Sequence, residues 1–115
     1  MRRGEVRLVD LDPVRGSEAD KRRPAVIVSN DEANTTASRL GRGVLTVVPI
    51  TSNVTQVFPF QVLIPAGTAG LRHHSKAQAE QVRSVAFERI GELLGNAPMQ
   101  VMVSLDHALR IHLAL

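Results

Sequence analysis

The sequence predicts a mainly β fold, in which a compact, strongly curved antiparallel sheet carries short helices and a C-terminal helix. Three features favour this class: several short apolar runs of strand length, one long polar loop after the first of them, and a helical pattern near the C-terminal end. The chain has 115 residues and shows neither a composition boundary nor an internal repeat. We therefore expect a single domain over residues 1–115.

The first two strands are expected on either side of the long loop. Residues 4–10 alternate loosely between polar and apolar side chains, as a strand does, and residues 13–22 form the polar loop. Residues 24–29 are a nearly continuous apolar run, which indicates a strand that is buried on both faces. Pro24 is expected to be its first residue, because proline lacks the N–H that a sheet ladder uses.

A short helix and a third strand follow in the pattern. Asn30 offers an N-cap, and the acidic residues after it favour a helical segment through about Leu40. The tripeptide Gly41-Arg42-Gly43 then predicts a tight turn. It leads into an apolar strand over residues 44–50.

The second half of the chain is predicted to contain two more strands and the terminal helix. Residues 60–65 have a strand pattern, and residues 76–85 mix polar and apolar side chains and are predicted as one strand. Pro98 fits the first turn of a helix that runs to the C-terminus. One face of this helix would carry its larger side chains, Met102, Leu105, Leu109, His112 and Leu113.

The basic side chains are mostly arginine. The formal net charge is only +3, yet 12 of the 14 basic residues are Arg. Arginine binds phosphate through a planar fork and stacks on bases, whereas lysine is the usual solubilising residue. Arg15, Lys21, Arg22 and Arg23 gather around one loop. Such a run is often a solvated face, but this one adjoins a candidate phosphate site, so we interpret it as a footprint for nucleic acid.

That phosphate site is expected where two neighbouring strands end. Arg23 directly precedes Pro24 at the start of an apolar run, where a guanidinium can bind phosphate through two hydrogen bonds. The hydroxyls of Thr51 and Ser52 and the amide of Asn53 follow the next strand and can donate to anionic oxygens. An arginine beside a cluster of short donors is a typical anion site.

The sequence offers no pattern typical of a metal site, a cysteine-based site or a membrane-spanning segment. The absence of cysteine removes disulfides, thiolate ligands and cysteine nucleophiles. His73 and His74 would point apart in an extended chain, and His107 and His112 lie five residues apart on the expected helix, so no ligand set forms. We expect no metal and no cofactor. No apolar run approaches membrane-spanning length, and we expect a cytoplasmic protein with no membrane contact.

Seven short segments occur in a characteristic order along the chain. They are residues 2–6, 9–13, 16–18, 23–29, 48–52, 58–60 and 80–84. Any one of them alone would be weak, since such patterns also occur by chance. Together they resemble the MazF/Kid (PemK-like) family of toxin endoribonucleases from type II toxin–antitoxin systems, over nearly the whole chain.

The resemblance implies a fold, a reaction and partners. The fold is the plasmid-maintenance-toxin β-barrel shared by MazF, Kid and CcdB, assembled as a homodimer. The reaction is sequence-specific, metal-independent cleavage of single-stranded RNA through attack of the 2′-hydroxyl, which inhibits translation and growth. The partners are single-stranded RNA and a cognate MazE-like antitoxin.

The resemblance also implies catalytic roles for Arg23 and Thr51. Arg23 would meet the negative charge that develops on the phosphorane oxygens. An arginine pKa above about 12 makes it a poor proton donor near neutrality. Thr51 would donate a hydrogen bond to the phosphate, with Ser52 and Asn53 as further RNA contacts.

Glu18 is the candidate general base, and an ion pair to Arg15 or Arg22 is an equally weighted alternative. Ser17, in the same turn, fits a turn former better than a nucleophile, because no histidine lies in a partner motif. Ser17, Arg15 and Arg22 are candidate RNA contacts.

Phe58 and Gln81 are further candidate RNA contacts. Phe58 lies in the polar loop after Thr51 and could stack on a base, although the ordinary place of phenylalanine is a core. Gln81 could read a base edge, although a glutamine on a strand of a dimeric fold more often serves the interface. Family members commonly carry an aromatic residue where this chain has Arg7-Leu8, so its core or RNA groove should differ there.

Two other functions remain open at this point. One is a CcdB-like toxin that poisons gyrase by binding and cuts nothing. The other is a non-catalytic module that binds nucleic acid through the same arginines. The Arg23 and Thr51 segments favour the endoribonuclease, because a toxin that acts by binding alone does not require them.

Overall fold

Seven strands and two helices make up the computed structural model, which describes residues 1–11 and 22–115. The strands are β1 (Glu5–Asp10), β2 (Arg22–Ile27), β3 (Val44–Thr51), β4 (Gln61–Ile64), β5 (Ser75–Gln78), β6 (Arg83–Ala86) and β7 (Ile90–Asn96). The helices are α1 (Asp31–Leu40) and α2 (Met99–Leu113), and two 3-10 turns are η1 (Ala79–Gln81) and η2 (Phe87–Arg89). The mainly β class with a C-terminal helix is confirmed.

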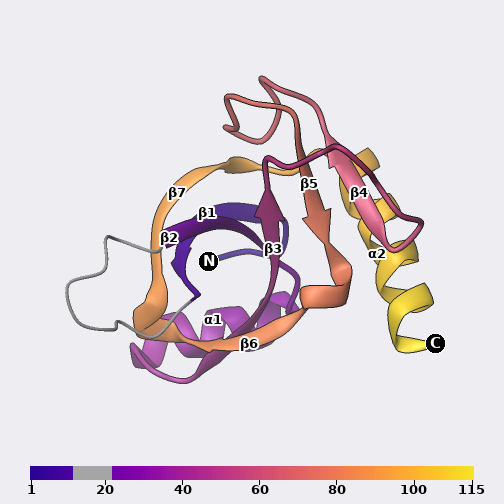
Figure 1. Cartoon of the computed structure of the whole chain (residues 1–115). Coiled ribbons are helices and arrows are strands. Elements are labelled where there is room, and N and C mark those ends of the chain that lie inside the picture. The colour runs from indigo at the N-terminus through magenta and orange to yellow at the C-terminus, as the bar shows by residue number, and fades with distance from the viewer. Residues whose placement is uncertain (12–21) are drawn as a thin grey trace, which may run out of the picture.

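The strands form one antiparallel sheet in the order β4-β5-β3-β2-β1-β7, with β6 also paired to β3. Figure 1 shows β7, β1, β2, β3 and β6 curving around a common centre, while β4, β5 and α2 lie to one side. Along the described pairings the sheet stays open between β4 and β7. The predicted compact, strongly curved antiparallel sheet is therefore confirmed.

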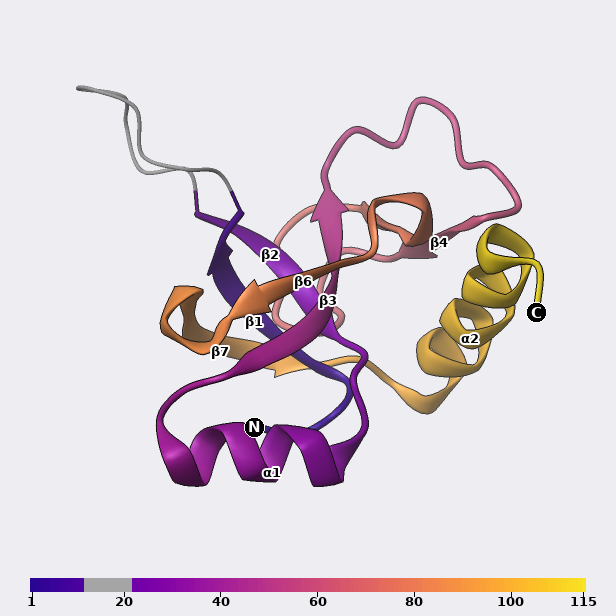
Figure 2. The same ribbon diagram turned by 90° about the horizontal axis from the view of Figure 1, so that it is seen from below.

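The sheet buries apolar side chains on both faces. Val26 in β2 and Val48 in β3 belong to a core with α2, whereas Ile27 and Val47 belong to a second core with α1. Successive side chains of a strand point to opposite faces, so neighbouring residues enter different cores. Figure 2 shows α1 and α2 covering different parts of the sheet. The expectation that the second strand is buried on both faces is confirmed.

β2 begins two residues earlier than predicted, so Arg22 belongs to the strand and Pro24 is its third residue. Pairing with β1 runs from Arg22 to Val26, but pairing with β3 covers only Ala25 to Ile27. At Pro24 the strand is therefore an edge on its β3 side, where a missing N–H costs no ladder bond. The two residues before Pro24 project from this edge.

Helix α1 confirms the predicted N-cap at Asn30, and Gly41 of the predicted turn proves to be its C-cap. The Asn30 side chain accepts a hydrogen bond from the Ala33 N–H, and Gly41 ends the helix in the left-handed conformation. Asn34 is fully buried, and its amide donates to the Ser29 carbonyl at 2.9 Å. The Ser29 hydroxyl in turn accepts from the Thr46 N–H at 3.1 Å, which ties the helix to β3.

The single strand predicted over residues 76–85 is wrong. β5 pairs with the end of β3 and β6 pairs with its beginning, and η1 lies between them. The interruption lies opposite Val48 and Pro49, which pair only with β2. β5 and β6 both pair with β3, and the chain bends between them through a 3-10 turn. The bend is set by pairing with a distant strand, so the local sequence pattern does not predict it.

The predicted C-terminal helix is present and begins at Met99, with Pro98 as its N-cap instead of a residue of its first turn. Its buried face agrees with the prediction only in part. The buried residues are Val101, Leu105 and Ala108, whereas His112 and Leu113 are exposed. Leu105 is buried and Met102 and Leu109 pack against the same core, so the predicted face is confirmed for these three and is wrong only for His112 and Leu113 in the last turn. Strand β7 was not predicted, since Gly91 and Gly95 interrupt its apolar pattern.

Candidate functional site

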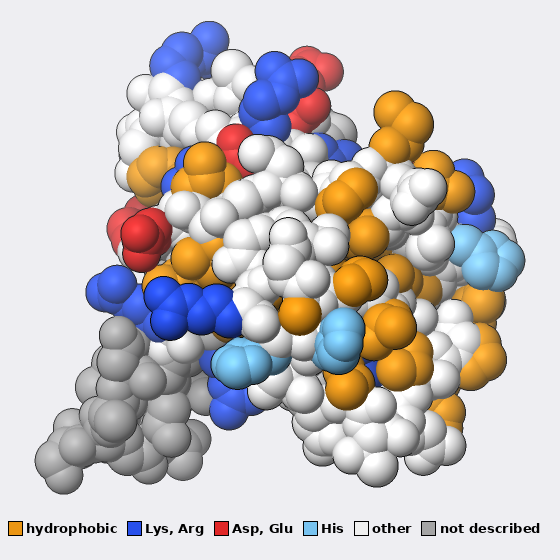
Figure 3. Space-filling view, turned by 90° about the horizontal axis from the view of Figure 1, so that it is seen from above, with side chains coloured by type: hydrophobic (Ala, Val, Ile, Leu, Met, Phe, Trp, Pro, Cys, Tyr) orange, Lys and Arg blue, Asp and Glu red, His pale blue; other side chains and the backbone are white. Residues whose placement is uncertain are grey.

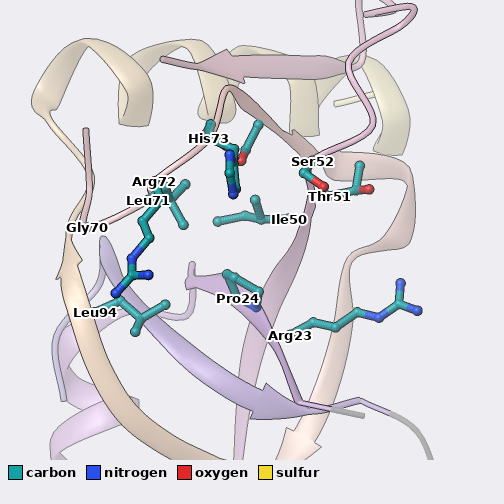
Figure 4. A pocket seen from close by; sticks show the side chains of 11 residues that line it. Arg23, Pro24, Ile50, Thr51, Ser52, Gly70, Leu71, Arg72, His73 and Leu94 are labelled. Atoms are coloured by element: carbon teal, nitrogen blue, oxygen red, sulfur yellow. The ribbon is translucent and has the colours of Figure 1, made fainter. Parts of the chain in front are cut away.

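The candidate site lies where β2 and β3 diverge. Ala25 pairs with Pro49, and continuing this register by two residues places Arg23 opposite Thr51. Figure 4 shows the two side chains on neighbouring strand ends, with the guanidinium of Arg23 reaching outward below Thr51. The arginine and the hydroxyls of Thr51 and Ser52 therefore line one cavity, as the sequence predicts, and their role as a phosphate site stays a prediction.

A cavity of about 430 Å³ opens beside these two residues. Its lining combines apolar side chains with two arginines, three hydroxyls and a histidine. The lining residues are Arg23, Pro24, Ile50, Thr51, Ser52, Gly70, Leu71, Arg72, His73, Ser75 and Leu94. In Figure 4 the His73 ring lies over Ile50, and Arg72 extends toward Leu94. Such a cavity can receive a ribose or base while the rim binds phosphate.

Arg23 has no hydrogen-bond or ion-pair partner in the described part of the chain. Its side chain is exposed at the cavity. The fold uses other arginines: Arg3 binds Asp106 at 2.5 Å and Arg7 binds Glu5 at 2.8 Å. Among the described arginines without a partner, Arg23 is distinguished by its place in the lining of both cavities. An unpaired guanidinium at the rim of a cavity leaves its donor fork available to an anion.

Thr51 ends β3, and the neighbouring strands β2 and β5 carry the basic residues Arg23 and Lys76. Its Oγ1 accepts a hydrogen bond from the Asn53 N–H at 3.2 Å, which leaves the hydroxyl proton available to a ligand. On its other side β5 places Lys76 directly opposite Thr51. Lys76 is buried, and its Nζ donates to the Gln56 carbonyl at 2.6 Å. Lys76 therefore fixes the loop after Thr51 and adds positive charge beneath it.

A second cavity, of about 300 Å³, lies on the other side of Arg23. Arg23 and Ile50 line both cavities. The second one is mostly polar, and its lining is Leu11, Arg23, Pro49, Ile50, Gln78, Gln81 and Arg83. The Arg83 Nη1 donates to the Leu11 carbonyl at 2.6 Å, which fixes one wall. Arg23 thus contributes to the lining of two cavities of different polarity.

The far wall of the first cavity is formed by the loop at residues 70–73, which the sequence did not predict as part of the site. Gly70, with φ of 76°, packs so closely on β7 that a Cβ there would lie 2.0 Å from the Leu94 carbonyl oxygen. This contact carries the exposed Arg72 and His73 to the cavity rim. The packing partner of Gly70 lies in β7, a strand that the sequence did not predict.

The structure brings together some of the expected site residues and leaves others apart. Arg23, Thr51 and Ser52 line the first cavity and Gln81 lines the second. Asn53 lies in the turn after Thr51, and Arg22 begins β2 opposite Asp10, but both are outside the two linings. The expected Arg15, Ser17 and Glu18 fall in residues 12–21, outside the described part of the chain.

Phe58 is also outside both cavity linings. Its ring stacks on Phe60 with 5.3 Å between centroids, and its N–H donates to Gln61 Oε1 at 3.1 Å. Phe58 as a whole is 40% exposed. Base stacking by Phe58 stays a prediction.

Arg7, which stands where the family commonly has an aromatic residue, is part of the sheet frame. Its Nε donates to Glu5 at 2.8 Å and its Nη1 donates to the Gly91 carbonyl at 3.0 Å. The side chain is only 19% exposed. The presence of arginine instead of an aromatic residue at position 7 therefore changes the contact between β1 and β7. Arg7 does not line either cavity.

Two kinds of feature, metal-ligand groups and membrane-spanning helices, were sought in the sequence and are answered by the structure for the residues that it describes. Across residues 1–11 and 22–115, no group of three or more histidine or acidic side chains is placed to hold a metal ion. Within the same ranges, no helix is both long and apolar enough to cross a membrane.

Comparison with known proteins gives a consistent result. Residues 2–113 match the profile of a family described as PemK-like, MazF-like toxin of type II toxin-antitoxin system. The chain is 60% identical to the endoribonuclease MazF9 of Mycobacterium tuberculosis over 115 residues, which is 100% of this chain and 98% of the relative.

Solved structures show the same fold. A crystal structure of MazF from Deinococcus radiodurans is similar with a TM-score of 0.78 and 26% identity, covering 100% of this chain and 97% of the other. A mycobacterial endoribonuclease in complex with its cognate antitoxin also has a TM-score of 0.78, at 23% identity, with 100% and 96% of the two chains covered.

Proposed function

Because the chain belongs to the PemK-like, MazF-like toxin family of type II toxin–antitoxin systems, we propose that it is a sequence-specific, metal-independent endoribonuclease that cleaves single-stranded RNA. The observation that carries the proposal is the unpaired guanidinium of Arg23 opposite Thr51 between two cavities. A phosphate needs such a donor fork, and two cavities beside it suit the nucleotides on either side.

The reaction uses the RNA as its own nucleophile. The 2′-hydroxyl attacks the adjacent phosphorus, the bond to the 5′-oxygen breaks, and a 2′,3′-cyclic phosphate and a 5′-hydroxyl result. Arg23 binds the equatorial oxygens as their negative charge increases, and the Thr51 hydroxyl donates to the same phosphate. Lys76 holds the Thr51 loop through the Gln56 carbonyl and raises the positive potential beneath it.

Proton transfer needs a base for the 2′-hydroxyl and a donor for the leaving oxygen. Glu18 is the proposed base on the strength of the family segment that contains it. Glu18→Gln should lower the cleavage rate at neutral pH and flatten its dependence on pH below neutrality. A Glu18→Gln enzyme with the wild-type rate and pH profile would remove Glu18 from the mechanism.

The mechanism is tested by cleaving a defined RNA in excess EDTA and mapping both ends of the cut. We expect cleavage to persist and to leave a cyclic phosphate and a 5′-hydroxyl. A single deoxyribose at the nucleotide 5′ to the cut should block cleavage there, while a deoxyribose two nucleotides away should not. If the first substrate is cut normally, water or a protein group is the nucleophile.

The proposal includes an antitoxin partner in the cytoplasm. The unpaired arginines that attract RNA also attract an acidic peptide, and the apolar side chains of the neighbouring cavity offer anchors for its side chains. A MazE-like segment would cover Arg23 and Thr51 and compete with RNA. Binding of a purified cognate antitoxin should displace non-cleavable RNA in a fluorescence-polarisation assay. Simultaneous binding of both would contradict this arrangement.

The proposal also includes a homodimer. Large apolar side chains remain exposed on β4 and α2, among them Leu63, Met99 and Val103 at 49%, 81% and 62%. In Figure 3 hydrophobic side chains spread over the side of the molecule that carries α2, whereas Lys and Arg gather on the other side. Sedimentation should give a dimer at micromolar concentration, and Val103→Glu should weaken it. A stable wild-type monomer would contradict the proposal.

A further inference from the structure

The polar cavity on the far side of Arg23 has features of a base-reading site. It is lined by the amides of Gln78 and Gln81 and by the guanidinium of Arg83, over a floor of Pro49 and Ile50. Its volume of about 300 Å³ can contain one nucleobase. The site rests on the proposed function, because Arg23 on its rim is the group proposed to bind the scissile phosphate.

The 3-10 turn places the two glutamines together. Gln78 ends β5 and caps η1, and Gln81 is the last residue of the turn. Side chains three residues apart on a 3-10 helix lie on the same side, so both amides reach one cavity. In the continuous strand expected from the sequence, residues three apart would have pointed to opposite faces. The break in the strand is therefore what builds this site.

Both amides are available to a ligand. The described part of the chain provides no hydrogen-bond partner for the side chain of Gln78 or Gln81. This contrasts with Gln61, whose amide accepts from the Phe58 N–H and donates to Glu80. A primary amide offers a donor and an acceptor side by side, which matches the edge of a base and not the all-acceptor surface of a phosphate.

Arg83 gives the cavity a fixed wall. Its Nη1 donates to the Leu11 carbonyl at 2.6 Å, so the guanidinium is held in place and its other N–H groups remain to be used. We propose that Gln78 and Gln81, supported by Arg83, read one of the two nucleobases that flank the cleaved phosphate. The larger, mostly apolar cavity on the other side of Arg23 receives the other flanking nucleotide through contact with Leu71 and Leu94.

The inference predicts a position-specific change in cleavage preference. A pool of RNA with randomised sequence is cut by the wild type, by the double variant Gln78→Ala/Gln81→Ala, and by Gln100→Ala as a matched control for an exposed glutamine on α2. Sequencing the new ends measures the preference at each position. Melting temperatures of all three proteins establish that they are folded.

We expect the double variant to lose about tenfold or more of its discrimination at one flanking nucleotide, while the other flanking nucleotide keeps its preference. Gln100→Ala should leave both unchanged. Gln81→Glu replaces the donor by an acceptor, so preference at the affected position should shift toward the bases that present an amino group (adenine, cytosine and guanine) and away from uracil.

Two outcomes would overturn the inference. One is a double variant that keeps the wild-type preference at every position. The other is a double variant that loses rate by the same factor on every RNA, since general damage gives no positional signal. In both cases the wild type still cuts RNA, so the proposed function stands. Failure of the wild-type protein to cut any RNA would instead contradict the proposed function itself.

Discussion

Arginine does two different jobs in two regions of this molecule. Near the N-terminus, Arg3 donates to the Val28 carbonyl at 2.8 Å and binds Asp106 at 2.5 Å, which ties β1 and the chain after β2 to α2. At the other end of β2, Arg23 lies at the rim of two cavities with no partner in the described residues. The comparison indicates that an arginine without a structural hydrogen bond or ion pair, placed at a cavity, is available to bind a ligand.

The largest expected effect follows from removing the unused arginine. Arg23→Ala and Thr51→Ala should each cost roughly 3–4 kcal/mol of transition-state stabilisation, or about a hundredfold or more in rate, as loss of one oxyanion-type donor does. The melting temperature of Arg23→Ala should stay near that of the wild type, because no described residue forms a hydrogen bond or ion pair with its side chain. Thr51→Ala also loses the hydrogen bond from the Asn53 N–H, so it should melt slightly lower. Single-turnover cleavage and thermal unfolding measure the two quantities.

The matched control for this prediction is Arg39→Ala, which removes an exposed arginine from the last turn of α1. It should leave the cleavage rate unchanged. A folded Arg23→Ala protein with the wild-type rate would remove Arg23 from catalysis.

The next largest effect tests whether the far wall of the first cavity depends on close packing. Gly70→Ala should lower the free energy of unfolding by roughly 2–4 kcal/mol, because its φ is 76° and its Cβ would collide with the Leu94 carbonyl. Gly41→Ala is the control: φ is also positive, 66°, but no atom lies within 4 Å of the added Cβ. Equal losses in the two variants, measured by urea unfolding, would exclude the packing explanation.

A smaller effect is expected when the structural arginine is removed. Arg3→Ala should lower the free energy of unfolding by roughly 1–2 kcal/mol, since it loses two partly exposed charged hydrogen bonds. The cleavage rate of the folded fraction at low temperature should equal that of the wild type. A rate loss without a stability loss would reverse the assignment of the two regions.

The smallest effect concerns acid stability in the structural region. The hydrogen bond from the Arg3 N–H, 2.6 Å long, holds the pKa of Asp31 below its ordinary value of 3.8. A lowered pKa stabilises the fold above the ordinary value, and this contribution is lost as pH falls through the lowered pKa. The stability difference between the wild type and Asp31→Asn should therefore shrink below about pH 4, as urea unfolding from pH 2 to 7 would show. A pH-independent difference would argue against it.

The sequence predicted one half of the site and missed the other, for physical reasons. Arg23 and Thr51 directly adjoin long apolar runs, and such runs mark buried strands whose polar neighbours come at the strand ends. Arg72 and His73 reach the cavity only because Gly70 packs on Leu94, a contact between distant segments. Gln78 and Gln81 share a cavity only because β5 and β6 follow different parts of β3. Local pattern carries no record of such pairings.

The measurement that tests the central claim most directly is the salt dependence of binding to an RNA made non-cleavable by one deoxyribose. If Arg23 binds a phosphate, Arg23→Ala should reduce the slope of log K against log salt by about 0.7, the value for one phosphate of a single strand, and Arg3→Ala should leave the slope unchanged. An unchanged slope in Arg23→Ala, or an equal decrease in Arg3→Ala, would contradict the division between arginines that build the fold and the arginine that binds RNA.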